Sequence, residues 1–212
     1  MIVTAIKPQK KGRKRLNLYL DGEFAFGLSP AVLDEAGISS GQELSDSDLK
    51  RIKRAEHGQQ ALERAHRFLA HRPRSEFEVR RRLERYGYDP DIIESTLIKL
   101  RADGLVDDES FAAFWKRNRQ EFNSRSARML ALELRSKGVD RDIIAATVEG
   151  VDDQAEAERA GRRKARSLPA GDYYQFRKKL AGFLSRRGFN YEVIGNTVDR
   201  LWQERFREDQ NG

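Results

Sequence analysis

The sequence predicts a mainly α-helical protein, in which three tandem three-helix repeats follow a small N-terminal β-hairpin region. The first observation is a motif that begins at Gly87, Gly138 and Gly188, so that its intervals are 51 and 50 residues. Three copies at a fixed period of this length indicate a repeat architecture. The second is the composition, because 35% charged and 38% hydrophobic residues are typical of an extended helical chain with much surface. The resulting domains are 1–57, 58–106, 107–151 and 152–212.

The N-terminal region differs from the remainder because its apolar residues follow the pattern of β-structure. Asp21-Gly22 separates two apolar segments and is a strong signal for a two-residue hairpin turn. The register that this turn predicts pairs Tyr19 with Phe24 and Asn17 with Phe26. Because an isolated hairpin is only marginally stable in water, we expect it to pack on the helices that follow. The alternative is packing on a partner, where exposed aromatic rings could stack bases.

A short strand is predicted at Ile2–Ile6, and a basic run follows it at Lys7–Arg15. Such a run is either a solvated loop or a contact for phosphate. Two helices then precede the repeats. The first begins at Ser29-Pro30 and ends at Gly37. The second is capped by Ser45 or Asp46 and runs to about His57, and Gly58 predicts a joint between it and the first repeat.

Each copy of the motif predicts a helix, a turn and a second helix. A leucine four residues before each glycine lies on the buried helix face, and glycine ends the helix because it adopts positive φ at little cost. An Asp or Asn two positions later is an N-cap, and an isoleucine begins the buried stripe of the second helix. In chain order these residues are Leu83, Leu134 and Leu184; Asp89, Asp140 and Asn190; and Ile93, Ile144 and Ile194.

Further signals place the remaining helices of the repeats. Gln59–His71 has one apolar face and predicts the first helix of repeat one. Ser75–Glu78 has the pattern of a capping box for the middle helix. Asp107–Ser110 is suited to the N-terminus of the helix that opens repeat two; a two-metal carboxylate site is the alternative. Leu168–Gly171 separates the first and middle helices of repeat three.

The sequence contains no pattern of residues that predicts catalysis. It has no cysteine, so thiolate chemistry and disulfides are excluded and a cytoplasmic location is expected. His66 and His71 are five residues apart, which is the wrong spacing for two metal ligands on one helix face. There is neither a phosphate-binding loop motif nor an apolar run long enough to span a membrane. We therefore expect no enzyme, no metal, no cofactor and no membrane association.

Positive charge recurs at equivalent places in the repeats. The net charge is +7, which favours an anionic partner, either nucleic acid or an acidic protein face. Basic residues precede each glycine turn on the middle helices, and if the repeats stack regularly they form one stripe. The alternative is a solvated face that nearby acids balance. The candidate residues for binding are Arg74, Arg81, Arg82, Arg85, Arg128, Arg135, Lys137, Arg186 and Arg187.

With the repeats laid out, residues from about Ala61 to Leu201 resemble the RecX family of bacterial recombination regulators. The resemblance lies in four segments that occur in the same order as in the family. One departure is Ser126, where family members often have glycine before the second middle helix. The segments are Arg72–Val79 (RPRSEFEV), Gly104–Arg119 (GLVDDESFAAFWKRNR), Leu132–Val139 (LELRSKGV) and Phe183–Phe189 (FLSRRGF). The N-terminal hairpin is similar to an extension that some members carry.

The resemblance implies an elongated, curved array of three three-helix units. It implies binding along the groove of the RecA–DNA filament and inhibition of RecA ATPase and strand exchange. We also expect single- and double-stranded DNA as partners and a monomeric protein. The associated processes are recombination, DNA repair and the SOS response. The basic stripe is compatible with this function but does not establish it.

Two other functions are compatible with the sequence. A stand-alone helix–turn–helix DNA-binding protein needs a polar recognition helix for base edges. The helices after Gly87 and Gly138 instead begin with acidic and apolar residues, Asp91–Glu94 and Asp142–Ile144, which argues against sequence-specific binding. A protein-interaction scaffold that does not act through RecA is the other alternative, and only the basic charge argues against it.

Overall fold

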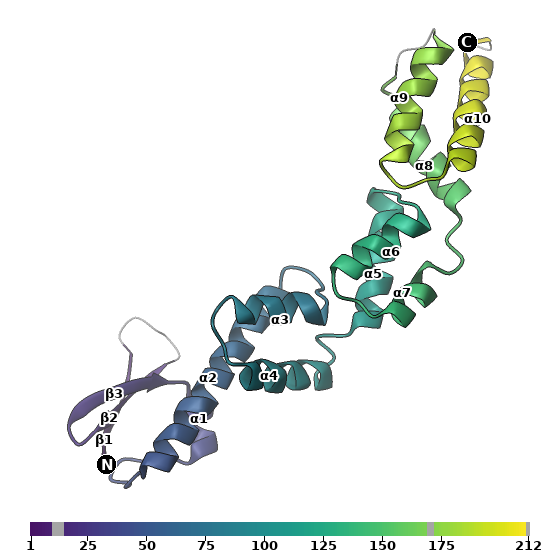
Figure 1. Cartoon of the computed structure of the whole chain (residues 1–212). Helices are drawn as coiled ribbons and strands as arrows, with labels where there is room; N and C mark the ends of the chain where they lie inside the picture. The colour runs from purple at the N-terminus through teal and green to yellow at the C-terminus, as the bar shows by residue number, and fades with distance from the viewer. Residues whose placement is uncertain (10–14, 169–171, 211–212) are drawn as a thin grey trace. The chain divides into compact units, whose positions relative to one another are not determined.

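A computed structural model of the chain describes residues 1–9, 15–168 and 172–210, the last five by their backbone alone (Figure 1). In these residues it has three strands and ten helices. The strands β1 (Val3–Pro8), β2 (Leu16–Leu20) and β3 (Glu23–Leu28) precede α1 (Pro30–Ala36). Repeat one has α2 (Asp46–Leu69), α3 (Glu76–Glu84) and α4 (Pro90–Ala102). Repeat two has α5 (Asp108–Phe122), α6 (Ala127–Ser136) and α7 (Arg141–Val148), and repeat three has α8 (Asp153–Ala165), α9 (Tyr173–Ser185) and α10 (Tyr191–Gln210).

The chain divides into two compact units, which do not coincide with the repeats. Unit 1 consists of Met1–Arg72 and Val79–Val106, and unit 2 consists of Pro73–Glu78 and Asp107–Gly212. The first turn of α3 therefore belongs with repeats two and three. None of the helices in the described part of the chain is long and apolar enough to cross a membrane.

The three strands form one antiparallel sheet in the order β1-β2-β3. Tyr19 pairs with Phe24 across the Asp21-Gly22 turn, as the sequence predicts. The predicted pairing of Asn17 with Phe26 is wrong, because the register shifts after Tyr19 and Asn17 pairs with Gly27. The shift is a β-bulge, in which one strand carries an extra residue.

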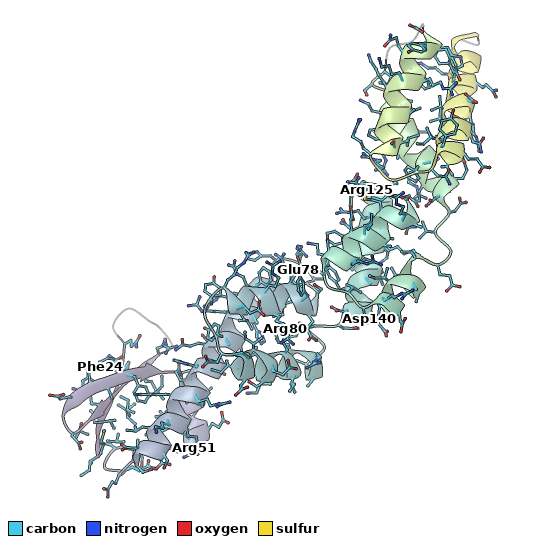
Figure 2. All side chains as sticks on the ribbon, viewed as in Figure 1. Phe24, Arg51, Glu78, Arg80, Arg125 and Asp140 are labelled. Atoms are coloured by element: carbon cyan, nitrogen blue, oxygen red, sulfur yellow. The ribbon has the colours of Figure 1, made fainter. Side chains whose placement is uncertain are left out.

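The sheet packs on the helices that follow it, so the prediction of packing within the chain is confirmed. Val3, Leu18 and Leu28 are fully buried in one cluster with Ile52 of α2. Phe24 lies on the outer face of the sheet and is 57% exposed (Figure 2). Most of the basic run Lys7–Arg15, residues 10–14, lies outside the described residues.

Helix α2 continues through Gly58, so the predicted helix end at His57 and the joint at Gly58 are wrong. A glycine inside a helix costs only about 1 kcal/mol relative to alanine. The buried stripe on both sides of it, with Ile52 before and Ala61 and Ala65 after, offsets that cost because one face of the helix is covered throughout.

Glu56 joins the N-terminal sheet to α2. Its side chain is 3% exposed, and a buried carboxylate must be paired or hydrogen-bonded. It accepts hydrogen bonds from the backbone N–H of Ser29 at 2.7 Å and from Gln60 at 2.8 Å, and it also pairs with Arg15. These donors replace water around the carboxylate and fix the position of the sheet on the helix.

Each repeat has its own apolar core. Leu83, Leu134 and Leu184, which the motif predicts to be buried, are all 0% exposed. The capping box of α3 is also confirmed, because Ser75 Oγ accepts from the N–H of Glu78 and Glu78 Oε2 accepts from the N–H of Ser75. The predicted break at Leu168–Gly171 falls between α8 and α9, and its residues 169–171 lie outside the described part of the chain.

The predicted turns have left-handed glycines, with φ of 75° at Gly87, 74° at Gly138 and 89° at Gly188. The caps that follow agree less uniformly with the prediction. Asp140 and Asn190 accept hydrogen bonds from the first turns of α7 and α10, as expected. Asp89 occupies the N-cap position of α4 but makes no side-chain capping bond. Pro90 occupies the first helical position, where its missing N–H costs nothing.

Candidate nucleic-acid interface

The candidate binding residues lie on or next to the middle helices α3, α6 and α9. Five of them are exposed, although their positions in the three helices are not identical. An exposed guanidinium can approach a phosphate without first breaking a buried contact. These five are Arg81 and Arg85 in unit 1, and Arg128, Arg135 and Arg186 in unit 2. The remaining four candidates are only partly exposed.

The first turn of α3 makes a joint with the end of α6. Ser75 Oγ donates a hydrogen bond to the carbonyl of Lys137 at 2.6 Å, and the N–H of Glu76 donates to Asp108 Oδ1 at 2.9 Å. Gly138 faces Phe77 so closely that a Cβ on the glycine would lie 2.4 Å from the Phe77 Cβ. The turn that ends α6 therefore needs glycine for packing as well as for its φ.

An equivalent joint connects repeats two and three. The N–H of Ser126 donates to the carbonyl of Arg187 at 3.1 Å, and the N–H of Ala127 donates to Asp153 Oδ1 at 2.7 Å. A Cβ on Gly188 would lie 2.6 Å from Ser126 Oγ. In both joints a serine cap, an aspartate at the start of the next repeat and a glycine turn meet. The repeated sequence thus specifies a repeated contact.

Burial at the first joint changes the titration of Asp108. Desolvation raises the pKa of this carboxyl, and the nearby charges of Glu76 and Asp107 raise it further. The hydrogen bond from the backbone of Glu76 lowers it, but by less. The carboxylate is therefore held at the joint against a desolvation cost.

Lys137 and Arg74 lie at the first joint, where both form ion pairs with the Glu78 carboxylate. Lys137 Nζ is 3.0 Å from Glu78 Oε1 and 5.1 Å from the centre of the Trp115 ring, while Arg74 Nη1 is 3.8 Å from the same carboxylate oxygen. Glu78 is labelled in Figure 2. Both cations contribute to the joint, so a ligand has to compete with Glu78 for them.

Arg187 occupies the same place in the second joint, where the described side chain that accepts its hydrogen bond is an amide rather than a carboxylate. It donates to Asn123 Oδ1 at 2.8 Å and lies 3.9 Å from the centre of the Phe183 ring. Burial lowers the pKa of Arg187, and the positive charges of Arg125, Arg186 and Arg163 lower it further. The residue three positions after the serine cap is Glu78 in the first joint and Met129 in the second. The guanidiniums of Arg125, Arg163 and Arg186 lie near that of Arg187 in this second joint.

Two of these four arginines, Arg125 and Arg163, were not among the residues predicted from the sequence. Arg125 donates to the carbonyl of Arg186 at 3.3 Å and lies 3.5 Å from Glu133, at the α9 side of repeat two in Figure 2. Arg163 donates to the carbonyl of Glu121. The available signal was that Arg74 and Arg125 both stand directly before a serine cap. Arg163 had no such signal.

Arg82, the last of the nine candidates, contacts aromatic rings. Its Nη2 donates to Tyr86 Oη at 3.0 Å, and its guanidinium lies 5.4 Å from the centre of the Phe68 ring.

Among the residues described, no group of three or more His, Cys, Asp or Glu side chains is placed to hold a metal ion. The carboxylates at Asp107 and Asp108 instead accept hydrogen bonds from helix N-termini.

The fold and this surface define a helical-repeat protein whose middle helices present cations to solvent. The chain belongs to the RecX family of regulatory proteins. Four family models match it in order: the regulatory protein RecX N-terminal domain at residues 1–45 and the first, second and third RecX three-helix domains at residues 61–100, 107–148 and 152–197. These matches follow the division into a small β region and three helical repeats.

Two relatives and two solved structures show the extent of the similarity. The chain is 34% identical over 213 residues to the regulatory protein RecX of Lactobacillus johnsonii. The matched region covers 99% of this chain and 78% of the relative. It is 29% identical over 208 residues to that of Bacillus subtilis, with 95% and 78% covered.

A crystal structure of regulatory protein RecX has the same fold, with a TM-score of 0.70 at 24% identity, covering 93% of this chain and 98% of that one. The structure of RecX from Lactobacillus salivarius gives a TM-score of 0.58 at 20% identity, covering 70% and 98%.

Proposed function

We propose that this protein regulates homologous recombination and DNA repair by binding RecA–DNA filaments in the cytoplasm. Binding inhibits the ATPase and strand-exchange activities of RecA. Membership of the RecX family supports a regulatory role. The observation that carries the proposal is that the middle helix of every repeat has exposed arginine: Arg81 and Arg85 on or just after α3, Arg128 and Arg135 on α6, and Arg186 at the end of α9.

A polyanion is the partner that such a surface favours. Each phosphate that a cation neutralises releases counterions, so several spaced cations give affinity that falls steeply with salt. Exposed cations on the middle helices of all three repeats suit a partner that carries many phosphates, such as a DNA filament. A basic surface of this kind also steers association by long-range attraction.

A stand-alone DNA-binding protein that reads base sequence is a weaker proposal. The helices that follow the turns, α4 and α7, begin with the exposed acids Asp89, Asp91, Asp140 and Asp142. Carboxylates at the N-terminus of a helix that enters the major groove would repel the phosphates on both sides. Contacts with the backbone of DNA or with the filament are not opposed in this way.

Co-sedimentation with RecA filaments on single-stranded DNA tests the proposal. The informative variant is Arg128→Gln with Arg135→Gln, because both residues are exposed on α6. The control is Arg117→Gln with Arg141→Gln, which removes the same charge from exposed positions on α5 and α7 of the same repeat.

The α6 variant should bind filaments less tightly and reduce the salt slope by about one to two units, while the control should bind nearly as the wild type does. Equal binding by both variants, or sedimentation of the protein with naked DNA but not with filaments, would contradict the proposal.

A further inference from the structure

A second basic surface lies on unit 1, between α2 and α3, and its pocket has a different character from the exposed arginines. The pocket has a volume of about 230 Å³ and is lined by Arg64, Arg67, Phe68, His71, Arg82 and Tyr86. Three guanidiniums and an imidazole thus meet two aromatic rings. None of the residues that the structure describes as lining it is acidic.

Tyr86 holds two of these arginines in place. The guanidinium carbon of Arg64 lies 4.2 Å from the centre of the Tyr86 ring, and that of Arg82 lies 5.0 Å from it. Arg64 Nε also donates to Tyr88 Oη at 2.9 Å, and Arg82 Nη2 donates to Tyr86 Oη at 3.0 Å. Because neutral partners fix the two guanidiniums, their full charge remains, and less side-chain entropy is lost when a ligand binds.

Elsewhere the same unit balances its arginines with acids. Arg80 Nη2 lies 2.7 Å from Glu94 Oε2, and Arg101 Nη2 lies 2.8 Å from Glu94 Oε1. The hydrogen bond from Arg80 is the largest reason why the pKa of Glu94 is lowered. Other pockets of the molecule contain carboxylates as well, such as Glu204 beside Arg205. The pocket between α2 and α3 therefore has an excess of positive charge, which an anion would neutralise.

The aromatic walls restrict which anion is favoured. Tyr86 is 46% exposed, and a flat ring can lie against it or against the guanidiniums stacked beside it. Arginine also binds phosphate through two parallel hydrogen bonds. A nucleotide unit of a single strand offers both an accessible base and a phosphate. In a duplex the base is stacked between its neighbours, so its faces are not available.

We propose that this pocket binds a nucleotide of single-stranded DNA, with the phosphate between the guanidiniums of Arg64, Arg67 and Arg82 and the base against Tyr86. This site rests on the proposed function, because it supplies a contact to the DNA strand in addition to the exposed arginines of the middle helices. The pocket differs from the exposed arginines of the middle helices because it requires an unpaired base.

Binding of a fluorescein-labelled oligothymidylate, measured by anisotropy without RecA, tests the site. Arg64→Gln with Arg67→Gln should weaken binding by roughly tenfold or more and lower the salt slope by about one unit or slightly more. Tyr86→Leu should weaken it by about fivefold or more, because a base–aromatic stack is lost. Tyr86→Phe retains the ring and should bind within about twofold of the wild type.

The matched control is Lys50→Gln with Lys99→Gln, which removes two exposed cations from unit 1 outside the pocket. It should change the affinity by no more than about threefold, since it removes only diffuse attraction. Circular dichroism establishes that each variant is folded, and Arg67→Gln alone, at an exposed position, serves if the double variant is not. An abasic strand of equal length should bind the wild type more weakly than oligothymidylate does.

The proposal is overturned if the folded pocket variants bind oligothymidylate as the wild type does, or if the lysine control loses as much affinity. It is also overturned if duplex or abasic DNA binds equally tightly, or if only a polyglutamate peptide responds to the substitutions. Since the assay contains no RecA, its result is separate from filament binding. A loss of filament binding with an intact oligothymidylate response would remove the proposed function and leave the pocket.

Discussion

Two glycine turns in equivalent positions allow the packing of the joint to be separated from the geometry of the turn. Gly87 and Gly138 have nearly the same φ, 75° and 74°. A Cβ at Gly87 would meet no atom within 4 Å, whereas at Gly138 it would lie 2.4 Å from both Cβ and Cγ of Phe77. Alanine at the two positions therefore has the same backbone cost but a different packing cost.

The expected magnitudes follow from these distances. An alanine in the left-handed region costs about 1–2 kcal/mol, and this is the whole effect expected for Gly87→Ala. Overpacking a tight contact adds about 1–3 kcal/mol, so that Gly138→Ala should cost about 2–5 kcal/mol. Part of the additional cost should be recovered in Gly138→Ala with Phe77→Ala, because that change removes Cγ and the ring from the contact.

Urea unfolding measures these differences by circular dichroism for the whole chain and by tryptophan fluorescence for repeat two. Trp115 packs against Phe111 in the core of that repeat, with ring centres 5.7 Å apart, and Trp202→Phe leaves it as the single tryptophan of the chain. Repeat proteins need not unfold in one step, so the local probe is necessary. Equal destabilisation by Gly87→Ala and Gly138→Ala would refute the joint as described.

Three further predictions concern stability and titration. Gly58→Ala should stabilise the protein by about 0.5–1 kcal/mol, because the position is helical and a Cβ there would meet nothing within 4 Å; a lower midpoint in thermal unfolding would contradict this. Glu56→Ala should lower the free energy of unfolding by about 3–5 kcal/mol, since the N–H of Ser29 and the charge of Arg15 lose a buried partner. A decrease below about 1 kcal/mol in urea unfolding would contradict this. Asp108 should titrate above the ordinary pKa of aspartate in carboxyl-resolved NMR, so its contribution to stability should fall as pH rises from the ordinary value through the folded value. A pKa at or below the ordinary value would show that desolvation does not dominate.

Much of the fold could be predicted from the repeated motif, because glycine turns and buried leucines depend on local sequence. The three glycines have the predicted positive φ, and Leu83, Leu134 and Leu184 are buried as expected. The helix through Gly58 could not be predicted, because a helix-breaking tendency of about 1 kcal/mol is opposed by packing on residues distant in the sequence. The β-bulge was missed for a similar reason, since a two-residue turn fixes the register only near the turn.

The candidate site was less predictable, because charge in a sequence does not show which acid lies opposite. Lys137 lies beside Glu78 across the first joint, and Arg187 lies beside Asn123 across the second. These partners are far apart in the sequence, and only the contacts between helical segments bring them together. The exposed arginines of the middle helices remain a prediction for binding, and they are the part of the surface on which the proposed function depends.

The most direct test of that function is the rate of ATP hydrolysis by RecA on single-stranded DNA, measured while this protein is added. The wild type should lower the rate at concentrations at which it sediments with the filament. Arg128→Gln with Arg135→Gln should require a higher concentration for the same effect, and the effect should weaken as salt rises. An unchanged ATPase rate while the wild-type protein covers the filament would contradict the proposed function.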